Sequence, residues 1–341
     1  MNVSTKNYSY FIGIDMAKKK FDACIINDLG KKMVHKVFIK SPDCFDDFLI
    51  WVKAQTNSTN VLFIMEYTGV YSRLLWFYLQ DNSCDLIMES GFKVNRSAGI
   101  KKGKNDKVDG YLIANYGFEK RHILQLTADY EEDLFVLHDL LSNRRRLIDQ
   151  IKAIETPLNE LKDYATKKIY DLLKEINMAA IAGLKKSLKE INEAIDTLIQ
   201  ENEDWKENIK YGSSVKGISK ILICWMIVYT RNFCPIFNAR KFASLAGIAP
   251  FEHSSGTSIN KGNHVSHFSH KFLKGILHMA AITALTHDPK MKAYYKKKKE
   301  TEGKKGFVTI NNVKNKLVQI VFALVRTKSI YKPDFVHKLA A

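Results

Sequence analysis

The chain has 341 residues, of which 46% are hydrophobic, and this length predicts two or three domains with sizeable cores. Its formal net charge of +17 lies in the C-terminal part, because residues 1–210 contain 31 basic and 31 acidic side chains whereas residues 211–341 contain 22 and 5. This excess indicates nucleic acid as the partner, ahead of an acidic membrane surface. The N-terminus has no signal-peptide pattern, and no apolar run approaches the roughly 18 residues of a membrane span, so we expect a soluble intracellular protein. The cysteines form no C-x-x-C pair, which argues against a disulfide framework and a zinc site, and we expect reduced core thiols.

Residues 8–125 contain short apolar segments typical of a sheet with helices packed on it. Three of them, "YFIGIDMA", "FDACIIND" and "MVHKVFIK", predict an antiparallel meander. The following "SPDCFDDFLIWVKAQ" begins like a helix, with Ser41 as N-cap and Pro42 at the first helical position. Strand, helix and strand then alternate in "NVLFIMEYTG", "VYSRLLWFYLQDN" and "CDLIMES". This order predicts a mixed α/β sheet of the ribonuclease-H-like type, although many α/β domains begin similarly.

Residues 128–210 lose the strand signals and show the periodicity of helices. Apolar residues recur at heptad spacing, and Pro157 predicts a break or kink in the first of two helices. The segment is predicted to be a helical hairpin or coiled coil, and two roles are open: an intramolecular spacer and a dimerisation element. The seam consists of Leu134, Leu137, Leu141, Ile148, Ile151 and Leu158 in the first helix and Ile181, Leu184, Leu188, Ile191, Ile195 and Leu198 in the second.

Residues 211–341 are predicted to be mainly helical and strongly basic. The stretch "VKGISKILICWMIVYT" resembles the entry of a helix-hairpin-helix unit, whose tight turn offers N–H groups to phosphate. "FASLAGIAPFEHSSGTSINKGN" is predicted to pass from a helix into a long polar loop, before "HKFLKGILHMAAITAL" resumes the helix. The lysine-rich "YYKKKKETEGKKG" is predicted to be a solvated loop that contacts phosphates without sequence preference.

Four carboxylates suggest chemistry. Asp106 and Asp109 share one face at the start of a predicted helix, where they act either as cap and dipole partner or as a pair that holds a cation. Asp15 and Glu66 each follow an apolar strand, and these two strands are neighbours in a ribonuclease-H-like sheet. A buried, unpaired acid is costly, so each of them faces water at the sheet edge or binds a metal. Four oxygen ligands suit Mg²⁺, and two ions about 4 Å apart can clamp a phosphodiester.

A candidate nucleophile lies in "HSSGTS". Loop serines are ordinarily surface residues, and Ser254, Ser255 and Ser258 cannot be ranked by chemistry alone. Serine also needs a base or a metal for activation, which the carboxylate cluster would supply. His253 is either a surface histidine or a group that assists the serine.

With these residues the sequence resembles the insertion-sequence one-ten family of transposases, bridge-RNA-guided DNA recombinases related to the Piv-type invertases. "GIDMAKKKFD", "MEYTGVYS" and "KNDKVDGYLIA" resemble its D-E-D-D motifs, and "FASLAGIAPFEHSSGTSINKGNHVSHFSHKFLKGILHMAA" resembles its serine-bearing domain. The resemblance spans nearly the whole chain. It implies a RuvC-like (ribonuclease-H-like) domain over residues 1–127, a helical coiled-coil linker over 128–210 and a basic helical transposase domain over 211–341.

The resemblance also implies a mechanism and partners. Ser255, the serine before the glycine, would attack DNA and form a covalent phosphoserine, while Asp15, Glu66, Asp106 and Asp109 hold Mg²⁺. A noncoding bridge RNA would select the DNA, and a homo-oligomer, a dimer that becomes a tetramer in the synapse, would join a serine domain to the carboxylates of a partner chain. We expect such a protein in the bacterial cytoplasm, at the nucleoid and without a membrane partner. Two alternatives are a metal-dependent nuclease such as a Holliday-junction resolvase, in which Ser255 is only structural, and a catalytically silent nucleic-acid-binding protein.

Overall fold

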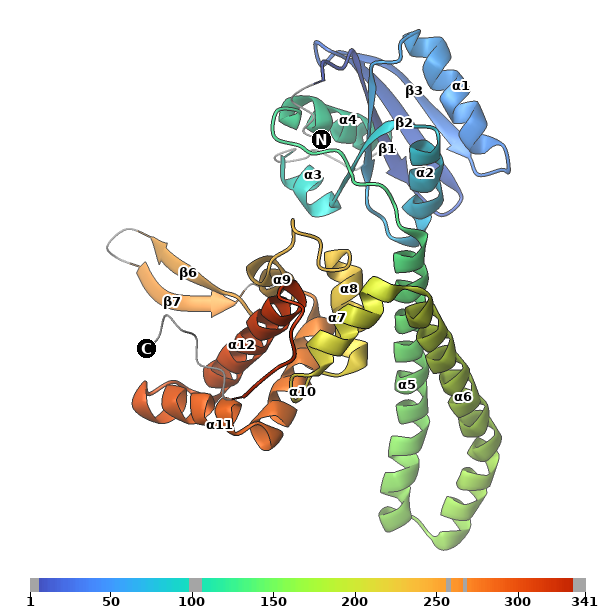
Figure 1. Cartoon of the computed structure of the whole chain (residues 1–341). Helices are drawn as coiled ribbons and strands as arrows, with labels where there is room; N and C mark the ends of the chain where they lie inside the picture. Colours follow the sequence, from blue (N-terminus) through green and yellow to red (C-terminus); the bar gives the residue numbers. More distant parts are fainter. Residues whose placement is uncertain (1–5, 98–105, 256–258, 266–268, 334–341) are drawn as a thin grey trace. The chain divides into compact units, whose positions relative to one another are not determined.

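Two structural units follow one another along the chain (Figure 1), Met1–Tyr130 and Glu131–Ala341. The computed structural model describes residues 6–97, 106–255, 259–265 and 269–333, with the backbone alone at 106–107, 252–255 and 259–264. Within these ranges no helix combines the length and the apolar character that crossing a membrane requires.

The first unit is built on a five-stranded mixed sheet with the order β3-β2-β1-β4-β5. Its strands are β1 (Tyr10–Met16), β2 (Lys20–Asn27), β3 (Lys32–Ile39), β4 (Val61–Glu66) and β5 (Asp85–Glu89). β1 pairs antiparallel with β2 and β2 with β3, whereas β1 pairs parallel with β4 and β4 with β5. The predicted antiparallel meander is therefore confirmed, as is the prediction that the first and fourth strands are adjacent in the sheet.

Alternate residues of the strands pack into two separate cores, one on each face of the sheet. Ile12 and Ile14 of β1 pack on one face with α1 (Cys44–Thr56) and α2 (Val70–Asp81), while Phe11 packs on the other face with α3 (Gly91–Ser97) and α4 (Asp106–Lys120). The helix predicted from Ser41 begins at Cys44, two residues later than its sequence suggested, which is the usual uncertainty of a helix end.

Helix α4 lies directly on the sheet and runs antiparallel to β1. A Cβ placed on Gly13 would lie 2.2 Å from the carbonyl oxygen of Gly110 and 2.3 Å from the amide nitrogen of Ala114, so only glycine permits this approach. Further along both elements, the rings of Phe11 and Phe118 are 5.5 Å apart. The first turn of α4 therefore lies at the edge of the sheet where β1 and β4 end.

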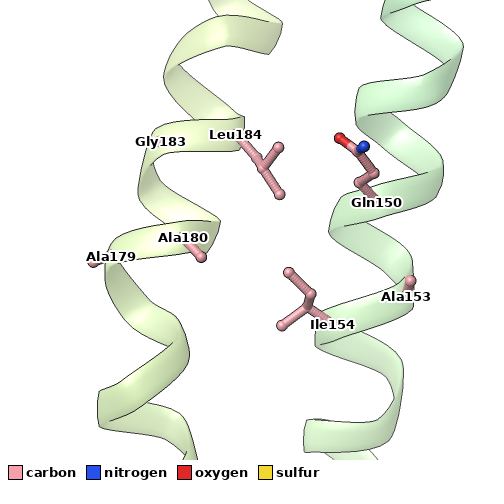
Figure 2. Close-up of a pocket in the computed structure, with 7 residues that line it drawn as sticks. All are labelled: Gln150, Ala153, Ile154, Ala179, Ala180, Gly183 and Leu184. Atoms are coloured by element: carbon pink, nitrogen blue, oxygen red, sulfur yellow. The ribbon is translucent and has the colours of Figure 1, made fainter.

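The second unit begins with a helical hairpin of α5 (Glu132–Tyr164) and α6 (Lys167–Glu201), as predicted. α5 does not break at Pro157 but continues for two further turns. Near the middle of the hairpin the small residues Ala153, Ala180 and Gly183 leave a groove of about 540 Å³ between the helices, into which Ile154 and Leu184 point (Figure 2). The seam is best packed at the base of the hairpin, where Leu137 and Ile195 are fully buried among the C-terminal helices.

The rest of this unit is a helical core with one β-hairpin. Its elements are α7 (Glu203–Ser213), α8 (Lys220–Thr230), α9 (Ala239–Leu245), β6 (Pro250–Ser255), β7 (Ile259–Val265), α10 (Lys271–His287), α11 (Pro289–Lys296), a π-helical turn (Lys297–Thr301) and α12 (Gly306–Arg326). Trp205, Phe242 and Leu277 are among its fully buried residues. All five cysteines are free thiols, but Cys84 and Cys234 are only partly buried, and burial raises the pKa of Cys224 to about 12.

Two predictions for this region are wrong. The stretch expected to be a long polar loop forms the antiparallel β6–β7 hairpin, because its pairing depends on backbone hydrogen bonds and not on the apolar alternation that marks a buried strand. The lysine-rich stretch expected to be a loop continues α11 into the π-helical turn, where Lys298 and Lys304 both pair with Glu302 at 2.6 and 2.9 Å.

Candidate active site

Four acidic residues stand side by side across the carboxyl edge of the first unit's sheet. Asp22 is directly opposite Asp15 in the β1–β2 register, and Glu66 is opposite Glu89 in the β4–β5 register. Ile14 pairs with Met65, so the next residues of these two strands, Asp15 and Glu66, are also neighbours. Alternation along each strand puts all four on the face that α4 covers. Adjacent strands are roughly 4.8 Å apart, so each acid lies beside its neighbour in the row, while the whole row spans about 14 Å.

The two outer acids of the row are neutralised within the protein. The Asp22 side chain, only 5% exposed, lies 3.0 Å from Nε2 of His35 and 3.3 Å from Nζ of Lys20. Glu89 accepts hydrogen bonds from the Tyr116 hydroxyl at 3.1 Å and from the Ser90 N–H at 2.9 Å, and Lys93 lies 3.1 Å from it. Burial and the neighbouring Glu89 raise the pKa of Tyr116 to about 12, which keeps its hydroxyl protonated as a donor. Asp22 is therefore held by cations of β2 and β3, and Glu89 by groups of α3, α4 and the residue that follows β5.

The two inner acids, Asp15 and Glu66, are half-buried at the ends of the two central parallel strands. The carboxylate of Glu66 lies against the backbone of Gly91, the first residue of α3, where an added Cβ would come within 1.9 Å of Oε1. A glycine at this position gives the carboxylate the room to occupy its place. The observed position of this inner acid therefore requires a residue without a Cβ at position 91.

The predicted helix pair completes the set. Asp106 and Asp109 are in the first turn of α4, which begins at this same edge, and Asp109 is half-buried. Asp106 is four residues before Gly110, a spacing that keeps both on one side of the helix, and its side chain is outside the described residues. The positive end of the helix dipole favours carboxylates in this turn. The fold therefore brings the elements that carry Asp15, Glu66, Asp106 and Asp109 to one place.

The donor chemistry of this place fits a hard divalent cation, since carboxylate oxygens are the ligands that Mg²⁺ prefers. Among the side chains that the structure describes, which do not include Asp106, no three of His, Cys, Asp and Glu are close enough together to hold a metal ion. The described carboxylates alone therefore do not make a metal site, and the contribution of Asp106 stays a prediction.

The predicted nucleophile belongs to the other unit. Ser255 is the last residue of β6, and its backbone pairs with Ile259 at the start of β7. The side chains of His253, Ser254 and Ser255 are outside the described part of the chain, as is the whole of Ser258. The serine and the acids are thus carried by different units, and the choice between neighbouring serines stays a prediction.

Sequence reasoning missed three residues of this site. Asp22 and Glu89 were not singled out, although an acid inside the apolar run "KFDACIIN" is a signal that could have found Asp22. Their place beside Asp15 and Glu66 depends on strand register, which the sequence does not give. Gly91 carries no sequence signal for its contact with Glu66.

Comparison with known proteins gives this arrangement a family. A family model described as "Transposase", for DEDD domains of the IS110 type, matches residues 12–163, and one described as "Transposase IS116/IS110/IS902 family" matches residues 212–296. The first range contains the four predicted acids and the second contains Ser255.

Individual relatives align over almost their whole length. The chain is 26% identical over 323 residues to the pilin gene-inverting proteins of Moraxella lacunata and Moraxella bovis, an alignment that covers 93% of this chain and 95% of each relative. It is 21% identical to the insertion element IS110 uncharacterized 43.6 kDa protein of Streptomyces coelicolor, with 96% of both chains covered. The DEDD domain implies a divalent metal ion, and the family implies binding to DNA. With a mixed-sheet DEDD domain followed by the family's second domain, the chain belongs to the IS110 family of transposases, enzymes that act on DNA.

Proposed function

We propose that this transposase cuts and rejoins DNA through a covalent phosphoserine at Ser255, assisted by the DEDD carboxylates. The observation that carries the proposal is the row of acids at the sheet edge, in which the outer pair has its own cations and the inner pair faces the first turn of α4. In the cleavage step the Ser255 Oγ bonds to phosphorus, its proton passes to a base, and the displaced DNA oxygen takes up a proton as a hydroxyl. Attack of a second DNA hydroxyl on the phosphoserine reverses these changes and reseals the strand.

The carboxylates have a supporting role. Asp15, Glu66, Asp106 and Asp109 would together hold Mg²⁺, which offsets the charge that develops on the phosphate oxygens. Lys20, His35 and Lys93 keep Asp22 and Glu89 engaged, so that the outer acids neither compete for the ion nor add uncompensated charge beside it. His253 next to the serines is a candidate for accepting the proton of Ser255.

Selection of DNA is assigned to a noncoding bridge RNA. The 22 basic and 5 acidic residues after residue 210 suit a domain that holds nucleic acid by its backbone, which carries no sequence information. Base pairing with the RNA would supply the sequence information that such contacts lack.

The active site is assembled in trans within a homo-oligomer. The acids and Ser255 lie on different units, and the hairpin of α5 and α6, which lies between them in sequence, is the element that would dimerise. A dimer that forms a tetramer with two DNA partners would join each serine domain to the acids of another copy.

Detection of protein-bound DNA tests the proposal. Supercoiled DNA that carries the sequences flanking this reading frame is incubated with the protein, Mg²⁺ and the RNA transcribed from those flanking sequences, and the mixture is then denatured with detergent. The phosphoserine mechanism predicts labelled DNA that remains attached to the protein and disappears after protease treatment. Cleaved DNA with free ends and no attached protein would instead identify a metal-dependent nuclease.

A further inference from the structure

A second cleft, separate from the row of acids, lies entirely within the second unit, where the base of α5 meets α8 and the start of α10. It has a volume of about 340 Å³. We name it the arginine cleft, after Arg145 and Arg146 on its α5 side. The aromatic rings of the cleft are His138 of α5, Trp225 and Tyr229 of α8, and His270 and Phe272 at the start of α10.

The aromatic side chains of the arginine cleft pack closely on one another. Trp225 is only 3% exposed, its ring is stacked on Tyr229 at 5.8 Å and 19°, and the edge of Phe272 meets it at 5.1 Å. His270 caps α10, because its Nδ1 accepts the N–H of Leu273 at 3.3 Å. Nδ1 therefore carries no proton, and Nε2 donates its hydrogen to the Tyr229 hydroxyl oxygen at 2.6 Å. This bond sets the position of the Tyr229 ring.

The arginines form the opposite side. The guanidinium of Arg145 lies 4.2 Å above the ring of Phe272, and 48% of its side chain is exposed. One face of the guanidinium plane is thus covered by an aromatic ring, and the opposite face is available to a second flat group. Asp149 lies 3.6 Å from Arg145, and Arg146 makes no ion pair with any residue that the structure describes, so the net charge of the three is positive.

Flat groups, positive charge and limited size together define the ligand. A volume near 340 Å³ is at the small end of ligand sites, which range over about 300–1,000 Å³, and it suits one nucleotide and not a duplex. Bases of single strands stack on aromatic rings and on guanidinium planes, whereas bases of a duplex have their faces covered by neighbouring pairs. Burial lowers the pKa of His270, and the charges of Arg145 and His138 lower it further, so the charge for phosphate comes from the arginines.

We propose that the arginine cleft binds one unpaired nucleotide of a single-stranded nucleic acid, with the base stacked on Arg145 and the phosphate beside Arg146. Such a nucleotide arises in single-stranded RNA and in locally melted DNA alike. α10 begins at Lys271, shortly after β7 ends at Val265, so the cleft is linked by a short segment to the hairpin that carries Ser255. The inference concerns binding and does not depend on the serine chemistry.

Fluorescence anisotropy with the full-length protein tests the proposal. The probes are a labelled oligodeoxynucleotide, the oligoribonucleotide of the same sequence, and the corresponding duplex DNA. Arg145→Lys keeps the charge beside Asp149 but removes the flat guanidinium, so it should raise the Kd for a single strand about tenfold and leave the Kd for the duplex nearly unchanged. Arg326→Lys, the same change on an exposed residue of α12, is the matched control and should alter neither.

The two single-strand probes show whether the nucleotide belongs to RNA or to DNA, because Arg145→Lys should raise the Kd more for the strand that the cleft normally binds. Photocrosslinking with 4-thiothymidine or 4-thiouridine in the same strands gives an independent readout, and the crosslinked peptides should contain residues that line the arginine cleft. An equal effect of Arg145→Lys on single strands and duplex would make the cleft a general backbone contact and overturn the proposal. Unchanged affinity for every probe, with crosslinks only outside the cleft, would also overturn it.

Discussion

Substitution of Gly91 by alanine tests whether the position of the Glu66 carboxylate matters for catalysis. The added Cβ would lie 1.9 Å from Oε1 of Glu66, whereas ordinary contacts begin near 3.4 Å. The carboxylate must therefore move by about 1.5 Å, which the flexible end of a glutamate side chain can do without displacing the backbone. A misplacement of about 1 Å in an active site can lower a rate by roughly 100-fold.

We expect Gly91→Ala to reduce recombination about 100-fold while leaving the fold intact. Alanine is favoured over glycine in helices by up to about 1 kcal/mol, so the free energy of unfolding should fall little or not at all. Recombination is measured by quantitative PCR of the new junction in cells that carry the protein and the DNA flanking its reading frame. Stability is measured by thermal and urea unfolding of the purified protein.

Two controls separate the Glu66 effect from a general one. Gly275→Ala adds a Cβ that meets nothing within 4 Å, so activity should be normal. In the Glu66→Gln background, Gly91→Ala should cause no further loss, because both changes act on one group. Normal activity of a correctly folded Gly91→Ala protein would refute the reasoning that Glu66 must occupy its observed place.

Further predictions concern the other parts of the site. Asp109→Asn should abolish DNA cleavage but retain binding in gel-shift assays, because it removes a candidate metal ligand without changing shape, and active protein would exclude that role. Binding to DNA should weaken steeply as the salt concentration rises. The double change Lys297→Gln and Lys299→Gln should lower the slope of log K against log salt concentration by up to about 1.8, at roughly 0.9 per phosphate contact. An unchanged slope would mean that these lysines only face solvent. Co-expressed, differently tagged Asp109→Ala and Ser255→Ala chains should recover DNA cleavage that neither chain gives alone. Mixed complexes that are isolated by pull-down and show no DNA cleavage would indicate a site built within one chain.

The central sheet could be predicted from the sequence because its signal is local and strong. Apolar residues in the six-residue β4 and its neighbours alternate between two buried faces, and the strand ends are marked by the acids Asp15 and Glu66. The adjacency of these strands then followed from the expected fold, and the observed pairing confirms it. The roles of the acids stay predictions.

The rest could not be predicted, for physical reasons that differ from case to case. The β6–β7 hairpin is polar along much of its length, and a polar strand gives no alternation of the kind that a core imposes. The row of acids depends on register, which places Asp22 beside Asp15 and Glu89 beside Glu66 through pairings between separate strands. The arginine cleft joins helices that are distant in sequence, and no local pattern marks it.

The central claim, a covalent phosphoserine at Ser255, is tested most directly by mapping the bond between protein and DNA. The protein–DNA adduct is isolated under denaturing conditions, digested with a nuclease and a protease, and the modified peptide is sequenced by mass spectrometry. The account predicts a nucleotide phosphate on Ser255, loss of the adduct in Ser255→Ala and its retention in Ser254→Ala. A phosphate on Ser254 or Ser258, or cleaved DNA with no modified peptide, would contradict it.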